Sequence, residues 1–199
     1  MKRVLMSMAV VLAAGLWAVS PPAVAQGKLV IKSLAQKRVS ELPAGPLFWL
    51  IETYASRAEA EAAVGPWGLV VESGGQVWLF TLGSQGAPLT GGTKVAEVGP
   101  IPLPVASRYV LRINEASGPP GSTTSVHSHP GSEAFYVLAG EQSIRTPGGV
   151  MRVEVGQPEA GHSADTPMQV TSTGTTNLRS LVMFVVDDSR PFSSPAKIQ

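Results

Sequence analysis

Short apolar runs that alternate with turn signals constrain the fold of this chain more than any other feature. From Tyr109 onward, segments such as YVLRINEA (109–116), EAFYVLA (133–139) and VMRVEV (150–155) are separated by stretches rich in Gly, Pro and Ser. Runs of this length with such boundaries are typical of strands in a sandwich or a barrel. The pattern predicts an all-β protein.

Residues 26–107, which precede this region, are less regular. The segment SRAEAEAAVG (56–65) predicts one short helix, because Ser56 and Glu59 form a capping box and a Gly-Pro pair follows the alanines. The segment LVVESGGQVWLFTL (69–82) predicts a hairpin around the turn SGG. We therefore expect an N-terminal extension with one short helix and one hairpin, packing on the barrel.

Several other segments lack a clear strand pattern. Residues 26–46 read as an extended arm in which KLVIKSL could pair as an edge strand. Residues 83–107 are dense in Gly and Pro but carry apolar anchors, which predicts a long ordered loop or covering arm. Residues 157–167 form a polar stretch with Gly and Pro, and residues 188–199 are expected to be a C-terminal tail.

The first 25 residues have the layout of a secretory signal peptide. Lys2 and Arg3 precede an uncharged apolar run that ends at a Pro-Pro pair, and Ala23 and Ala25 give the small-x-small pattern of a signal peptidase site. The apolar run is short for a membrane-spanning helix. We expect cleavage after Ala25 and a periplasmic or secreted protein that is not attached to the membrane.

The composition excludes several classes of function. The chain has 15 Lys and Arg residues against 14 Asp and Glu residues, and no basic run, which argues against nucleic acid as a partner. It contains no cysteine. Disulfides and thiolate metal sites are therefore excluded, and an exported form must be stabilised by its apolar core.

Two histidines one residue apart mark the most informative segment, TTSVHSHPGSEAFYVLAG (123–140). Side chains alternate between the two faces of a strand, so His127 and His129 share a face. The turn PGS can bring the carboxylate of Glu133 beside both imidazoles. Two imidazoles and one carboxylate are a suitable ligand set for divalent Fe, Mn, Ni, Cu or Zn.

The alternative is a solvent-exposed hairpin with chance histidines. Two observations favour the metal site. The chain has only three histidines, all within residues 127–162. Glu133 also begins a row that continues with Phe135 and Val137 on the same face, where an unpaired carboxylate would be costly. We expect Phe135 and Val137 to line a cavity beside the metal ligands.

The spacing Gly121-x5-His127-x-His129-x3-Glu133-x6-Gly140 matches the first sequence motif of the cupins at every position. The chain therefore resembles a cupin protein. Five residue identities at fixed spacings make this resemblance much more specific than the pair of histidines alone.

The resemblance covers residues 108–187 and implies a single cupin domain, a jelly-roll β-barrel. It also implies a metal inside the barrel, held by His127, His129 and Glu133. It does not imply one activity, because cupins include dioxygenases, isomerases, lyases, decarboxylases, sugar-binding modules and storage proteins. Cupins often pair through an edge strand or a swapped arm, so the resemblance also allows a homodimer.

The second cupin motif is where this chain departs from the family pattern. In the segment SADTPMQVTSTG (163–174), Ser163 stands where the family has Pro and Asp165 where it has Gly. Met168 occupies the position of the fourth ligand, a histidine in the family. The completion of the metal site is therefore open.

Four readings of the site follow. The ion could be held by three protein ligands, with Met168 as a core or cavity-lining residue. His162 could replace the missing ligand, although it lies six residues earlier and across a turn. Met168 could ligate through its sulfur, which would favour copper. The last reading is that no metal binds.

Two functions are consistent with these residues. A site with two histidines and one carboxylate leaves open coordination positions, which predicts an exported small-molecule metalloenzyme of oxygenase type. His162 is the only candidate for a general base outside the ligand set. Loss of the second-motif histidine instead favours a non-catalytic binding module for a small molecule or a metal.

Overall fold

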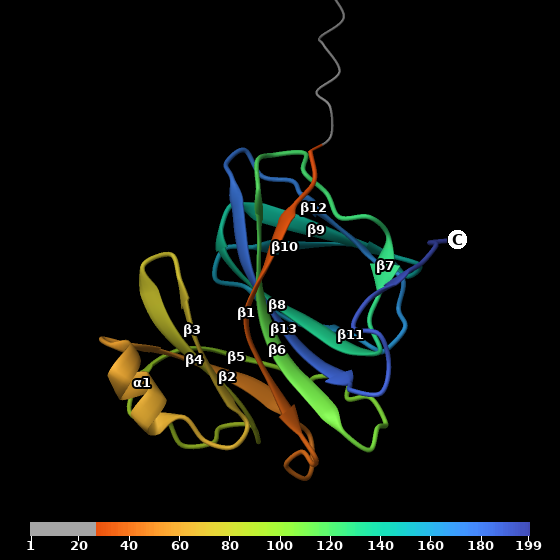
Figure 1. Ribbon diagram of the computed structural model, residues 1–199. Helices are drawn as coiled ribbons and strands as arrows, with labels where there is room; N and C mark the ends of the chain where they lie inside the picture. The colour runs from red at the N-terminus through yellow and green to blue at the C-terminus, as the bar shows by residue number, and fades with distance from the viewer. Residues whose placement is uncertain (1–26) are drawn as a thin grey trace, which may run out of the picture.

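A computed structural model describes residues 27–199 of the protein (Figure 1). The segment expected to be a signal peptide, residues 1–25, lies outside the described residues. No helix in this part of the chain has the length and apolar character needed to cross a membrane.

The described residues form one short helix and fourteen strands. In chain order these are β1 (Val30–Val39), β2 (Phe48–Tyr54), α1 (Arg57–Ala63), β3 (Gly68–Ser73), β4 (Gln76–Gly83), β5 (Thr93–Val98), β6 (Tyr109–Gly118), β7 (His127–Ser128), β8 (Gly131–Ala139), β9 (Glu141–Thr146), β10 (Gly149–Glu154), β11 (Pro158–His162), β12 (Gln169–Ser172), β13 (Leu178–Asp187) and β14 (Ser194–Pro195). The all-β prediction is confirmed.

Strands β6 to β13 form the expected jelly-roll barrel. One antiparallel sheet has the order β1-β6-β13-β8-β11, and the facing sheet has the order β10-β9-β12. The segment around β7 extends the second sheet, because Thr123 pairs with Thr171 and His127 pairs with Met168. The first barrel strand, β6, thus pairs with the last, β13, and apart from the β9–β10 hairpin the successive strands alternate between the sheets in the manner of a jelly roll.

The large sheet is buried on both faces, which explains the nearly continuous apolar sequences of β8 and β13. In β13, Val182 and Phe184 belong to the cluster inside the barrel. Leu181 and Met183 belong to a second cluster on the outer face. Tyr136 of β8 lies in this outer cluster, on the face opposite to Glu133 as strand alternation predicts.

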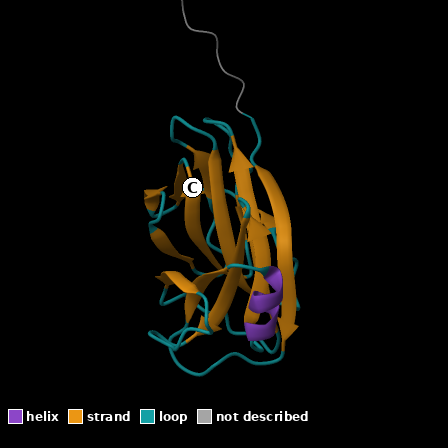
Figure 2. Ribbon diagram, turned by 90° about the vertical axis from the view of Figure 1, so that its left-hand side faces the viewer, coloured by secondary structure: helices purple, strands orange, loops and turns teal. Residues whose placement is uncertain are grey.

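The N-terminal extension covers the outer face of the large sheet. Its four strands form an antiparallel sheet of order β3-β4-β2-β5, and Trp49 and Phe80 pack into the outer cluster. Helix α1 lies on the far side of this sheet, away from the barrel (Figures 1 and 2), where Ala60 packs with Leu79. The capping prediction is confirmed, because the Ser56 side chain accepts a hydrogen bond from the Glu59 amide at 3.3 Å.

Three sequence expectations need correction. Residues 83–107 are not a continuous loop, because β5 pairs with β2 and completes the N-terminal sheet. The polar stretch 157–167 contains β11, which pairs with β8 at the edge of the large sheet. The possible edge strand in the arm is longer than KLVIKSL and pairs with β6 along its whole length, with one bulge.

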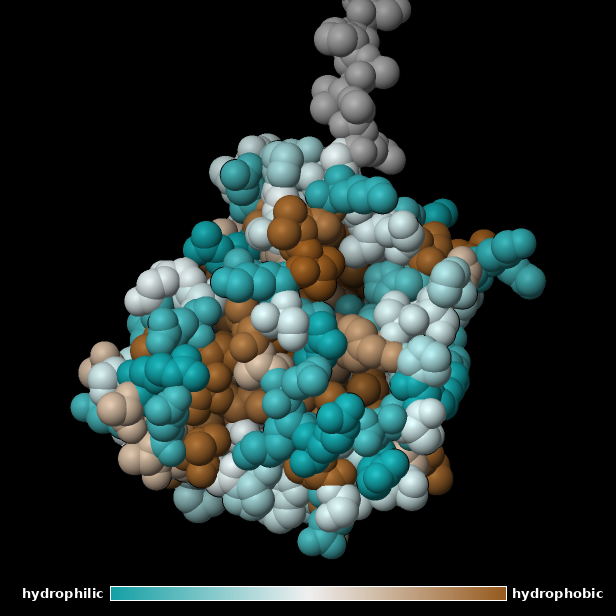
Figure 3. Space-filling model, in the orientation of Figure 1, coloured by the Kyte–Doolittle hydropathy of each residue, from teal (hydrophilic) through white to brown (hydrophobic). Residues whose placement is uncertain are grey.

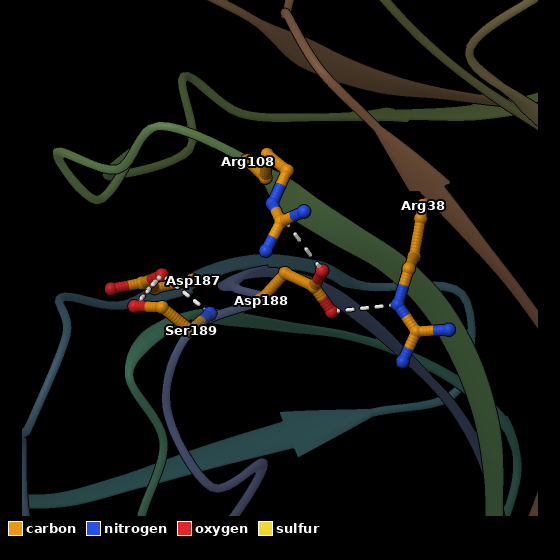
Figure 4. A network of polar contacts seen from close by, with 5 residues as sticks. All are labelled: Arg38, Arg108, Asp187, Asp188 and Ser189. Atoms are coloured by element: carbon orange, nitrogen blue, oxygen red, sulfur yellow. Dashed lines mark hydrogen bonds and ion pairs between the residues drawn. The ribbon is translucent and has the colours of Figure 1, made fainter.

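The C-terminal residues are also more ordered than a tail. Figure 4 shows Asp188, just beyond β13, between Arg38 and Arg108, at N–O distances of 2.8 and 3.9 Å. Ser189 donates to Asp187 through its amide and its hydroxyl. The chain then crosses the end of the barrel, and β14 pairs with β7. This path brings the C-terminal residues to the two histidines.

Candidate metal site

The first-motif residues are positioned by the backbone at both ends of β7 and β8. Gly121 and Gly140 have φ angles of 84° and 73°, which residues other than Gly rarely adopt. A Cβ atom on Gly140 would also lie 2.9 Å from the Asn177 carbonyl oxygen. These glycines let the chain turn before β7, which carries His127, and after β8, which carries Glu133.

The side chains of His127, His129 and Glu133 converge inside the barrel. One ligand atom from each of the three lies within 4.8 Å of the others. The Glu133 Oε2 atom is 3.5 Å from His129 Nε2 and 3.9 Å from His127 Nε2, which is too long for a hydrogen bond. Glu133 Oε2 is buried and has no hydrogen-bond partner in the described residues.

The opposite ring nitrogens are held by backbone carbonyls. His127 Nδ1 lies 2.8 Å from the Ser125 carbonyl oxygen, and His129 Nδ1 lies 2.6 Å from that of Phe192. A carbonyl oxygen can only accept, so each Nδ1 carries the proton, and in the neutral form of each ring the lone pair of Nε2 is directed toward Glu133. This second-sphere arrangement is typical of histidines that ligate metals.

Burial opposes charge on two of the three groups. It raises the pKa of the Glu133 carboxyl to about 8. It also lowers the pKa of the His129 imidazole to about 4, although the hydrogen bond to the Phe192 carbonyl acts in the opposite direction. His129 and Glu133 therefore do not form an ion pair at neutral pH. A divalent cation would supply the positive charge that all three ligand atoms lack, so the residues fit a metal.

A cavity of about 300 Å³ lies beside the three side chains. Its remaining wall is mainly apolar and comes from both sheets, from β1 and from the C-terminal residues. The lining residues are Ile31, Asn114, Ala116, Thr124, Ser125, Phe135, Val170, Val182, Phe184, Phe192 and Ser193. This volume is at the lower end for small-molecule sites.

The second-motif segment, residues 163–174, lies against His127 and His129, as its assignment to the second motif predicts. Asp165, at the position of the family's Gly, has a φ of 63°, the conformation that Gly adopts most readily. Its amide donates to the His129 carbonyl at 2.7 Å. Met168 pairs with His127 through two backbone hydrogen bonds of 3.0 and 2.8 Å. Met168, which stands at the position of the fourth-ligand histidine, therefore lies directly opposite His127 on the neighbouring segment.

Of the other four predicted site residues, only one lines the cavity beside the converging side chains. Phe135 lines the cavity. Val137 and Met168 are buried in the interior cluster but are not among the lining residues. His162 pairs with Glu133 in the sheet register, yet its ring is not in the converging group and instead lines a separate pocket beside the β9–β10 hairpin.

The sequence pattern gave no indication of the C-terminal contribution. The Phe192 ring packs against His129 and Phe184, with ring centroids 4.7 and 5.0 Å away. Arg190 forms a two-pronged ion pair with Asp165 at 2.9 and 2.6 Å. The C-terminal residues thus hold His129 through the Phe192 carbonyl and are tied to the second-motif turn. Within residues 188–199, only Phe192 and Arg190 could have indicated from the sequence that this segment contacts the site.

No protein-family model and no curated protein sequence matches this chain. Solved structures that match include the DMSP lyase DddQ of Ruegeria pomeroyi, at 22% identity over 45% of this chain and 44% of that one, with a TM-score of 0.38. The chain thus spans less than half of that lyase.

Two further matches are a protein of Klebsiella pneumoniae with a double-stranded β-helix domain and a cupin superfamily protein of Desulfitobacterium hafniense. The first has 16% identity over 44% of this chain and 75% of that one, with a TM-score of 0.39. The second has 17% identity over 39% and 68%, with a TM-score of 0.35. All three TM-scores are below 0.5, so the jelly-roll fold is assigned from the strand order of this chain alone.

The metal-free protein should lose stability at high pH because of Glu133. The pKa of its carboxyl is about 8 in the folded protein against an ordinary 4.5. The resulting contribution to stability is complete below pH 4.5 and is lost as the pH rises through 8, and it amounts to about 5 kcal/mol at ~1.4 kcal/mol per pKa unit. We expect metal-free Glu133→Gln to be more stable than metal-free wild type at about pH 9. The difference in unfolding free energy between the two proteins should be smaller at about pH 6.5. Urea unfolding measures both, and identical pH dependence would contradict this account.

Deletion of residues 191–199 should weaken metal binding, because His129 Nδ1 loses the Phe192 carbonyl. Loss of such second-sphere acceptors typically costs about 10–100-fold in metal affinity. The matched control is deletion of residues 197–199, which leaves Phe192 and β14 in place. Zn²⁺ titration against a competing chelator gives both affinities. Equal affinities in the two truncated proteins would show that the C-terminal residues do not support the site.

Proposed function

We propose that the protein is an exported metal-binding protein that acts as a small-molecule metalloenzyme of oxygenase type. The single observation that carries the proposal is the convergence of His127 Nε2, His129 Nε2 and Glu133 Oε2, none of which has a hydrogen-bond donor among residues 27–199. His127 and His129 would hold a divalent transition metal through neutral nitrogens. Glu133 would supply a negative charge.

A divalent ion on two histidines and one carboxylate keeps open positions at which a substrate and dioxygen can be activated. The protein's own residues provide the surroundings. The two Nδ1 hydrogen bonds orient the imidazoles, and Phe135, Phe184 and Phe192 give the cavity an apolar wall. An apolar wall strengthens electrostatic interactions with a bound molecule.

The cavity itself favours oxygenase chemistry over hydrolysis or isomerisation. Within residues 27–199, the lining contains no ionisable group other than His127, His129 and Glu133. His162, the only candidate base, lines a different pocket. A reaction that needs a separate general acid or base is therefore poorly supported here.

The same observation also supports the second candidate, a non-catalytic module that captures a small molecule or a metal. In that case the open coordination positions would hold water or the captured molecule, and turnover would be absent. The replacement of the fourth-ligand histidine by Met168 agrees with this candidate. A homodimer stays a prediction from the resemblance alone.

We expect the purified protein to contain about one divalent transition metal per chain by elemental analysis, and to consume oxygen with a phenol, thiol or keto acid as co-substrate. His129→Ala removes a ligand and should abolish both. His162→Ala should retain the metal if three protein ligands suffice. Metal capture without oxygen consumption would favour the binding module, and metal at trace level in wild type would refute the metal site.

Export is proposed from the signal-peptide pattern in residues 1–25. Protein recovered from the periplasm or the medium of its host should begin at Gln26, because cleavage is expected after Ala25. N-terminal sequencing or intact mass measurement reads the start directly. A full-length chain in the cytoplasm would overturn the proposed localisation.

A further inference from the structure

The amide of Asn114 is a polar group that the metal site does not use. Asn114 lies on β6, is 2% exposed and lines the cavity beside Glu133. Arg112 donates from Nε to Asn114 Oδ1 at 2.8 Å. Arginine has only donors, so the atom that it contacts must be the amide oxygen. The Asn114 side chain is therefore fixed with its NH₂ group as the free end.

This NH₂ group is a preformed hydrogen-bond donor for a molecule in the cavity. The Asn114 side chain makes one hydrogen bond among the described residues, and it uses the oxygen. Buried polar groups normally find partners. An acceptor oxygen on a bound molecule is the complementary group, because both amide hydrogens are donors.

Arg112 adds positive charge next to this donor. Its side chain is partly buried, and the Arg112 guanidinium has no carboxylate within 4.0 Å among the described ion pairs, unlike Arg38 and Arg190. Its guanidinium carbon lies 4.1 Å from the centre of the Phe192 ring. Phe192 lines both the main cavity and the smaller pocket that contains Arg112. A partly desolvated cation at this place favours an anionic acceptor over a neutral one, although Asp187 and Asp188 line the same smaller pocket.

We propose that Asn114 is a specificity-determining residue that binds the carboxylate of a small organic acid, and that Arg112 is the positioning residue that orients it and supplies the charge. The apolar wall of the cavity takes the body of the acid, and its volume of about 300 Å³ limits the size. This inference rests on the proposed function of the cavity as a small-molecule site and names the class of molecule.

Benzoate and benzamide test the proposal, because they share a shape and differ in charge. Isothermal titration of the wild-type protein should show benzoate binding at least about tenfold more tightly than benzamide, the range expected for a hydrogen bond to a charged group. Glu133 opposes an anion in the same cavity when it is ionised, so each titration is run with Zn²⁺ and without it. Equal affinities for the two probes, or no binding of either, would overturn the proposal.

Three variants locate the effect. Asn114→Asp replaces the donor by acceptors at nearly the same shape and should lower benzoate affinity about tenfold or more. Arg112→Gln should remove the preference for benzoate over benzamide. Ser193→Ala is the matched control, because Ser193 lines the same cavity. The Ser193→Ala protein should bind benzoate with an affinity within about twofold of wild type. A loss of equal size in Ser193→Ala would contradict the specific role of Asn114.

Elemental analysis of the same samples separates the two proposals. A benzoate preference in a protein without metal would support Asn114 and refute the metalloenzyme. Stoichiometric metal without a benzoate preference would refute the role of Asn114 and leave the metal site intact.

Discussion

The commitment of both Nδ1 protons to backbone carbonyls is the interaction on which the rest of the site depends. It fixes the tautomer of His127 and His129 and leaves their Nε2 lone pairs directed at a third lone-pair donor, Glu133 Oε2. Three acceptors in a mainly apolar cavity cannot satisfy one another. Proton uptake by Glu133 or the binding of a cation relieves this conflict, and only the cation satisfies all three atoms.

The architecture explains how such an arrangement is kept in place. The large sheet is buried between the barrel interior and the N-terminal sheet, so the strands that carry Glu133 and Phe184 are held on both faces. The N-terminal sheet does not line the cavity, but it stabilises the large sheet that carries Glu133 and Phe184. Ile31 of β1 and Phe192 near the C-terminus also line the cavity.

Local sequence patterns predicted what depends on local chemistry. Strand alternation placed His127, His129 and Glu133 together, the capping box located α1, and the motif spacing indicated a jelly roll. The patterns failed where contacts join distant residues. Phe192 meets His129 across 63 positions of the chain, and no local signal marks that contact. Strands β5 and β11 were missed because their partners, and not their own apolar pattern, make them strands. His162 was misleading because its pairing with Glu133 does not bring its ring to the other two histidines, and the ring lines a separate pocket beside the β9–β10 hairpin.

His127, His129 and Glu133 share one small cavity with the oriented amide of Asn114, and we propose that the three converging side chains bind a cation. A crystal structure of the protein grown with Mn²⁺ or Zn²⁺, with anomalous diffraction to locate the ion, tests the central claim most directly. The account predicts one strong anomalous peak bonded to His127 Nε2, His129 Nε2 and Glu133 Oε2, with both Nδ1 atoms still on their carbonyls. An ion bound elsewhere, or a cavity in which these three atoms point apart, would contradict it.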